Sequence, residues 1–182
     1  FIHGDSLLDL PLVRQMALIQ EHHAQDIAQL QKMRADYFRD PFNPDLLNEM
    51  EAVKAKVRET LKSEVNFDGE PLFFALEFFY VYFDENGASL TEDQQGFDGI
   101  IGNPPYERVQ QLSQPDRKFY NQHYETATQN YDIYVLFVER GMQLLKDSGR
   151  LIYIQPNKFF NADYGKGLRR MISQNQWLHS LL

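Results

Sequence analysis

Two adjacent prolines end an apolar run near the middle of the chain. The run is Phe97-Asp-Gly-Ile-Ile-Gly102, and the next four residues are Asn103-Pro104-Pro105-Tyr106. Proline lacks a backbone N–H and has a fixed φ, so two prolines in succession can continue neither a β-ladder nor a helix. The sequence therefore predicts a short strand over residues 97–102 that stops at Asn103.

The segments after this strand follow the pattern of an α/β fold. Residues 131–146 are apolar on nearly all sides, which predicts a buried helix, and Gly149 is the predicted C-cap. Residues 151–154 are a predicted buried strand that Pro156 ends. A helix followed by a parallel neighbour of the first strand is typical of a sheet with both faces covered.

An amphipathic helix and a further strand are predicted at the C-terminal end. Leu168, Met171 and Ile172 recur at helical spacing. The next strand is expected to begin near Trp177. Three strands separated by helices would extend the same parallel sheet.

Residues 9–66 predict a helical hairpin. Asp9 is the expected N-cap of the first helix, with Pro11 in its first turn. Asn43 followed by Pro44 is the usual cap-then-proline start of a second helix. The hairpin is therefore interpreted as an insertion between elements of the sheet.

Two other segments are interpreted as structural. Residues 71–83 are aromatic and rich in β-forming types, and they are too apolar for a base-binding surface, so we expect them in the core. His22, His23 and Asp26 do not predict a metal site, because adjacent histidines do not share a helix face. We expect these three side chains at the solvated surface.

The surroundings of three cations in the C-terminal helix are not decided by the sequence. Lys166, Arg169 and Arg170 could face either DNA or water.

Composition excludes several classes of protein. Lys and Arg number 18 against 26 Asp and Glu, a formal charge of -8, and there is no cysteine. The absence of cysteine fits a reducing cytoplasm, where we expect the protein. No apolar run approaches the roughly 20 residues of a membrane helix, so we expect no membrane segment. The acidic balance disfavours a free-standing nucleic-acid binder, because phosphate attraction scales with Lys and Arg.

The residues after the first strand could hold a planar amino-heterocycle. Ligands of open α/β sheets bind beyond the carboxyl ends of the strands, and Asn103, Pro104 and Tyr106 are placed there. The Asn103 side chain and the Pro104 carbonyl can accept both hydrogens of an exocyclic amine. Tyr106 offers a flat ring that can stack on the heterocycle and favour its developing positive charge.

This stretch resembles motif IV, Asn-Pro-Pro-Tyr, of the adenine-N6 DNA methyltransferases. Segments on either side are similar to the large restriction-modification methylases and their phage-defence relatives: Gly69 to Phe83, Leu145 to Arg150 and Pro156 to Phe159. The resemblance implies a Rossmann-like sheet and transfer of a methyl group from S-adenosylmethionine to N6 of an adenine flipped out of double-stranded DNA. It implies catalytic roles for Asn103, Pro104 and Tyr106.

The same resemblance implies three cofactor-binding residues. His3-Gly-Asp-Ser-Leu7 looks like the acidic loop that contacts the adenine of S-adenosylmethionine, which would make Asp5 its hydrogen-bond acceptor and Leu7 its packing residue. Pro105 would lie against the cofactor side. Gly-Asp-Ser is also an ordinary turn and helix cap, which is the other explanation of Asp5.

The resemblance also implies that residues 1–182 are only part of a catalytic domain. The Gly-rich cofactor loop of motif I is expected before Phe1, and the target-recognition domain is expected after Leu182. We therefore expect DNA contact through the full-length protein and no activity from these residues by themselves. No feature of the sequence indicates an oligomeric state.

Two alternatives stay open at this point. Asn-Pro-Pro-Tyr also occurs in methyltransferases that act on protein glutamine or on RNA. The amphipathic hairpin, without a cofactor loop in the sequence, also suits a non-catalytic interaction module.

Overall fold

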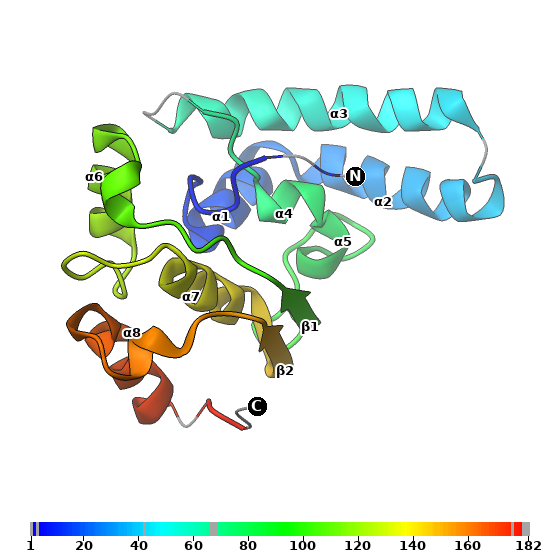
Figure 1. Ribbon diagram of the computed structural model, residues 1–182. Coiled ribbons are helices and arrows are strands. Elements are labelled where there is room, and N and C mark those ends of the chain that lie inside the picture. The colour runs from blue at the N-terminus through cyan, green and yellow to red at the C-terminus, as the bar shows by residue number, and fades with distance from the viewer. Residues whose placement is uncertain (1, 3, 42, 66–68, 176, 180–182) are drawn as a thin grey trace. The chain divides into compact units, whose positions relative to one another are not determined.

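The computed structural model describes the whole chain except residues 1, 3, 42, 66–68, 176 and 180–182. The chain divides into two compact units, residues 1–96 and residues 97–182. The first unit is helical and the second combines helices with a small sheet (Figure 1). The mixed α/β class expected from the sequence is thereby confirmed.

The first unit contains five helices among its described residues. They are α1 (Leu12–His22), α2 (Ala24–Arg39), α3 (Pro44–Ser63), α4 (Phe74–Glu77) and α5 (Phe79–Tyr82). Helices α2 and α3 lie side by side as the predicted hairpin (Figure 1). The Asn43 side chain accepts from the backbone N–H of Asp45 and Leu46, which confirms the predicted cap of α3.

The predicted first helix is broken in two at His23. The residue before α1 is Pro11, and Asp9 instead accepts a hydrogen bond of 2.9 Å from the Gln15 amide, so the predicted cap is wrong. His23 is 6% exposed. Its Nδ1 lies 2.7 Å from Asp26, and its Nε2 lies 2.8 Å from the Thr60 hydroxyl on α3. The expectation of a solvated histidine is therefore wrong for His23, because these two partners hold its ring inside.

The aromatic segment forms helices and not a strand. Helices α4 and α5 are separated at Phe78, which has a non-helical backbone. Phe73, Leu76, Phe79 and Tyr82 are at most 1% exposed, which confirms that the segment belongs to the core. A short apolar run that is buried on all sides suits a helix as well as a strand, so its β-forming residue types do not decide its secondary structure.

A buried carboxylate fastens this core segment to α3. Glu77 on α4 is 8% exposed and lies 2.8 Å from the Lys54 ammonium and 2.6 Å from the Arg58 guanidinium. Burial raises the pKa of Glu77, but the hydrogen bonds from Lys54 and Arg58 outweigh it and hold the pKa below its usual value. Glu77 is therefore a paired structural charge.

The second unit is built on a strand–helix–strand sequence. Strand β1 (Phe97–Gly102) pairs in parallel with β2 (Leu145–Tyr153), and α7 (Tyr134–Leu144) leads into β2. The predicted strand at 97–102 and the buried helix are both confirmed. The other elements are η1 (Val109–Gln111), α6 (Gln114–His123), η2 (Asn157–Phe160), η3 (Asp163–Gly165) and α8 (Lys166–Gln174), the last of which was also predicted.

Three details of the predicted sheet are wrong. Helix α7 ends at Leu144 and β2 follows directly, so Gly149 is not a C-cap but lies in β2 beside an irregularity in its register with β1. The second strand is not buried, since Ile152 is 59% exposed. Residues 177–179 form no strand, and residues 176 and 180–182 lie outside the described part. The sheet in the described part of the chain has two strands, and the side of β2 that carries Ile152 is exposed.

Of the helices in the described part of the chain, none combines the length and the apolarity that crossing a membrane requires.

Candidate functional site

Asn103-Pro104-Pro105-Tyr106 follows the carboxyl end of β1, as predicted. The neighbouring strand ends at the same edge, because the N–H of Ile154 donates to the Gly102 carbonyl at 3.1 Å. Asn103, Pro105 and Tyr106 are exposed, whereas Pro104 is buried. The motif therefore presents an amide, a proline ring and an aromatic ring at the edge where open α/β sheets bind ligands.

The Tyr106 hydroxyl joins the two strand ends. It lies 2.6 Å from Asn103 Oδ1 and 2.9 Å from the carbonyl oxygen of Ile154. A phenol has one hydrogen, which these two acceptors share. An amide oxygen has two lone pairs, so Asn103 retains capacity for a second donor while Tyr106 orients it.

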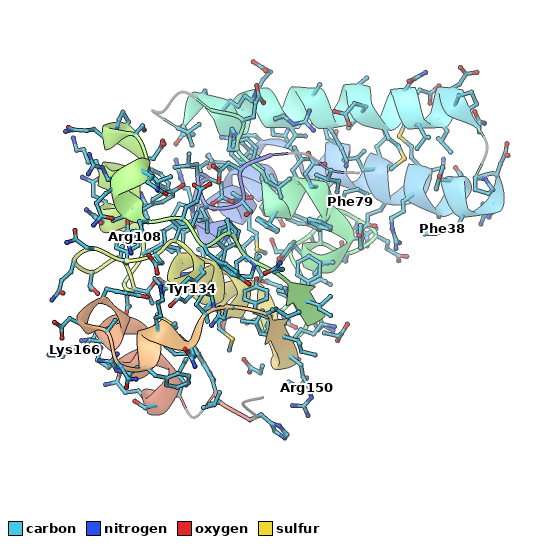
Figure 2. All side chains as sticks on the ribbon, viewed as in Figure 1. Phe38, Phe79, Arg108, Tyr134, Arg150 and Lys166 are labelled. Carbon is cyan, nitrogen blue, oxygen red and sulfur yellow. The ribbon has the colours of Figure 1, made fainter. Side chains whose placement is uncertain are left out.

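A second tyrosine holds the Tyr106 ring from the protein side. Tyr134, labelled in Figure 2, lies on α7 with its ring centre 6.5 Å from that of Tyr106 and the two planes at 89°. Tyr134 is completely buried, whereas Tyr106 is 50% exposed. Phe159 packs on Tyr134 in a similar edge-on arrangement, with centres 6.4 Å apart. Edge-to-face packing restricts the tilt of Tyr106 while half of its surface faces solvent.

A hydrogen-bonded chain fixes Tyr134 in turn. The Tyr164 hydroxyl donates to Asp132 at 3.0 Å, and the Tyr134 hydroxyl lies 3.0 Å from that of Tyr164. Because the hydrogen of Tyr164 points to the carboxylate, Tyr134 is the donor to Tyr164. Burial raises the pKa of Tyr164, and its bonds to Tyr134 and Asp132 raise it further. Burial likewise raises the pKa of Tyr134. Both phenols therefore stay neutral and rigidly oriented.

The loop after β2 is tied to α8. The Arg169 guanidinium donates to the carbonyl of Phe159 and, at 2.8 Å, to that of Ala162. Gly165 allows the close approach, since a Cβ there would lie 1.9 Å from the Phe159 carbonyl oxygen. The Arg169 guanidinium therefore holds the backbone of Phe159 in place. The sequence left open whether Arg169 faces DNA or water, and the structure directs its guanidinium to the protein backbone.

Asp5 and Leu7 belong to the first unit. The Asp5 carboxylate accepts from the N–H of Leu7 at 2.8 Å and from that of Leu8 at 3.2 Å. The backbone of Asp5 also bonds to Glu70 and Leu72. The turn that offers the other explanation of Asp5 is thus present, and it orients a partly exposed carboxylate. Leu7 is 1% exposed and contributes mainly to the core.

The structure brings together four of the predicted residues and adds three that sequence reasoning missed. Asn103, Pro104, Pro105 and Tyr106 are consecutive in the second unit. The added residues are Asp132, Tyr134 and Tyr164. Tyrosines and an aspartate within or beside apolar segments indicate that buried polar groups need hydrogen-bond partners. The sequence does not reveal which of these side chains bond to one another.

Geometry and comparison agree on the class of protein. The strand–helix–strand unit, with an amide and an exposed aromatic ring at the strand ends, defines an α/β protein. The model of the Eco57I restriction-modification methylase family matches residues 16–182. The chain belongs to that family, as the resemblance of the motifs predicted.

Two similar proteins are named as type II methyltransferases, one of them also as a restriction enzyme. The chain is 42% identical over 103 residues to the type II restriction enzyme and methyltransferase RM.Eco57I of Escherichia coli, which covers 55% of this chain and 10% of the relative. It is 37% identical over 85 residues to the type II methyltransferase M.BstVI of Geobacillus stearothermophilus, covering 47% and 15%. The chain therefore matches a minor part of the length of these relatives.

Proposed function

We propose that these residues form part of the catalytic domain of an S-adenosylmethionine-dependent DNA methyltransferase that modifies N6 of adenine in a restriction-modification or phage-defence system. Membership of the Eco57I family supports a role in restriction and modification. The observation that carries adenine-N6 chemistry is the Asn103–Tyr106 arrangement at the strand ends. Within this proposal β1, α7 and β2 are part of a Rossmann-like sheet, and residues 9–66 are a helical insertion.

In the proposed reaction Asn103 and Pro104 hold the amine. The second lone pair of Asn103 Oδ1 and the Pro104 carbonyl accept its two hydrogens. These bonds favour a nitrogen lone pair directed out of the ring plane and stabilise the positive charge that develops on the nitrogen. Bound S-adenosylmethionine would supply the methyl group: the nitrogen–carbon bond forms as the methyl–sulfur bond breaks, S-adenosylhomocysteine leaves, and the nitrogen loses one proton to solvent.

Tyr106 is proposed to stack on the flipped adenine. Tyr106 is 50% exposed, the tilt of its ring is set by Tyr134, and its hydroxyl is held by Asn103 and Ile154. A ring that is already oriented loses little conformational entropy when the base arrives. Base–aromatic stacking contributes about 1–3 kcal/mol.

Three residues are proposed to hold the cofactor. Asp5 fits this role because its partly exposed carboxylate is oriented by two backbone amides. Pro105 fits because it is exposed and directly follows Pro104, whose carbonyl is proposed to hold the amine. Leu7 would lie beneath Asp5, with little of its side chain accessible.

The test is methyl transfer by the intact protein to unmethylated double-stranded DNA, followed by mass spectrometry of the nucleosides. We expect Asn103→Ala to lower the rate of N6-methyladenine formation on the order of 100-fold to 1,000-fold, because it removes one acceptor of developing charge. Asn48→Ala, an exposed asparagine on α3, is the matched control and should leave the rate unchanged.

Three outcomes would contradict the proposal. Wild-type rates from Asn103→Ala would remove this residue from the site. Methylation of RNA or of a protein glutamine, without methylation of DNA, would favour the first alternative. The absence of any transfer by the intact wild-type protein would favour an interaction module.

A further inference from the structure

A polar hollow lies between α6 and the segment that precedes α7. It is open to solvent and has a volume of about 570 Å³. Its walls are a hydrophobic residue, two cations and six amides: Val109, Gln110, Gln114, Arg117, Lys118, Asn121, Gln122, Gln129 and Asn130. All of them belong to the second unit.

One face of α6 supplies most of this lining. Gln114, Arg117, Lys118, Asn121 and Gln122 follow the i, i+3, i+4, i+7, i+8 spacing that places residues on one side of a helix. That spacing is ordinarily occupied by apolar residues where a helix faces the protein. Here the polar face is largely exposed and borders an open concave surface, so several of its side chains are available to the same ligand.

The hollow is positively charged in an acidic chain. Arg117 and Lys118 line it, no carboxylate is among its described lining residues, and the whole chain carries a charge of -8. Arg117 Nε is buried and has no hydrogen-bond partner among the described residues. A buried donor without a partner costs free energy that a bound acceptor would recover. Arg, Lys, Asn and Gln are the side chains that contact phosphate oxygens in nucleic-acid complexes.

A short antiparallel pairing connects the hollow to the candidate site. The N–H of Val109 donates to the Tyr131 carbonyl at 3.0 Å, and the N–H of Ile133 donates to the Glu107 carbonyl at 2.8 Å. Glu107 directly follows Tyr106, and Ile133 directly precedes Tyr134. The wall of the hollow therefore continues into both tyrosines of the site.

One lining residue has an uncommon backbone conformation. Gln129 has a φ of 58°, the described chain's one positive value outside glycine. Residues other than glycine, asparagine and aspartate seldom adopt this left-handed region. The turn is thus held in a shape that the chain does not favour locally, and its Gln129 and Asn130 amides border the hollow.

We infer that this hollow is a binding site for the sugar–phosphate backbone of the DNA substrate, with Arg117 and Lys118 as the phosphate ligands. The inference rests on the proposed function for the identity of the substrate. It adds a contact surface on the catalytic unit itself, next to the base-stacking tyrosine. The amides beside the two cations supply further donors to phosphate oxygens.

The experiment measures how the affinity of the intact protein for a mixed-sequence DNA duplex depends on salt concentration. Each phosphate contact contributes about 0.9 to the slope of log K against log salt. We expect Arg117→Gln/Lys118→Gln to lower the magnitude of that slope by about 1.8, and the affinity at 0.1 M salt on the order of 10-fold to 60-fold. The control is Lys32→Gln/Arg39→Gln, which removes the same charge from two exposed positions of α2 and should change the affinity less than about 2-fold.

An unchanged slope in Arg117→Gln/Lys118→Gln, or an equal loss in the control, would overturn the inference. Lys118→Gln alone guards against misfolding, because Lys118 is exposed, and it should lower the slope by about 0.9. Methyl transfer by the wild-type protein tests the proposed function separately. If the wild-type protein failed to methylate DNA but the variants showed the expected slopes, the inferred backbone site would stand and the proposed reaction would be wrong.

Discussion

Two groups of polar side chains in this protein, one in each unit, behave in opposite ways. In the first unit, buried polar groups bind one another: Glu77 lies between Lys54 and Arg58, and His23 lies between Asp26 and Thr60. In the second unit, the motif side chains Asn103 and Tyr106 are exposed at the end of a strand. Polar groups that satisfy one another maintain a structure, whereas exposed groups at a strand end retain capacity for a ligand.

The largest effect should come from removing the buried carboxylate of the first unit. Glu77→Ala leaves two cations without their common partner, which costs about 3–5 kcal/mol in local stability. Hydrogen exchange of the α3 and α4 amides in the intact protein should accelerate about 100-fold or more. Replacement of all three charges in Glu77→Leu/Lys54→Met/Arg58→Met should restore most of the protection, since an apolar substitute of similar volume can equal a buried ion pair. Equal losses in both variants would show that packing, and not charge pairing, dominates here.

Acid should weaken the same contact. The folded-state pKa of Glu77 lies below its usual 4.5, so its contribution to stability is present above pH 4.5 and is lost as the pH falls through the folded-state value. We expect the difference in amide protection between wild type and Glu77→Gln to shrink as the pH falls below about 4.5. Comparison at each pH cancels the intrinsic pH dependence of exchange. A difference that persists or grows in acid would contradict a depressed pKa.

Tyr106 should show the contrasting behaviour of an exposed functional side chain. Tyr106→Ala removes the stacking surface, and we expect methyl transfer to fall about 10-fold to 100-fold with little change in stability. Tyr106→Phe keeps the ring and loses the bonds to Asn103 and Ile154, so its loss should be smaller. Fluorescence of 2-aminopurine at the target position separates stacking from chemistry. If Tyr106→Ala lowered stability as much as Glu77→Ala, the main role of Tyr106 would be to stabilise the fold.

The smallest effect is expected from the chain behind Tyr106. Tyr164→Phe removes the hydroxyl that joins Tyr134 to Asp132, at a cost of about 1 kcal/mol. Tyr134 then loses its acceptor, and the tilt of the Tyr106 ring becomes less restricted. Amide exchange in α7 should accelerate about 5-fold. Tyr37→Phe, on the helical hairpin, is the matched control and should leave α7 unchanged.

Local sequence correctly predicted the elements whose ends are marked by proline or by a capping residue. The strand at 97–102 and the helix from Pro44 were correct because prolines and a capping asparagine act through the adjacent backbone. The cap expected at Gly149 was wrong, and the β-forming residue types of residues 71–83 did not reveal that this segment is helical. In both places the outcome depended on burial against distant segments, which propensity does not contain.

The candidate site divides in the same way. The motif at 103–106 was placed from the sequence alone, whereas the chain through Asp132, Tyr134 and Tyr164 was not. Its members span about thirty residues, and their contacts depend on how α7 and the loop after β2 pack. The face of α6 that lines the hollow has a recognisable helical spacing, yet nothing in that spacing says that it borders a concave surface.

By itself, the sequence determined the family, the position of the Asn-Pro-Pro-Tyr motif after a strand and the hairpin helix that begins at Pro44. Each of these follows from residues that are neighbours in the chain or on one helix face. Only the tertiary structure decided that His23 is buried, that Tyr134 orients Tyr106 and that six amides and two cations line one hollow. The physical reason is that burial, ring packing and hydrogen bonding between distant segments depend on distances in space, and folding alone sets those distances.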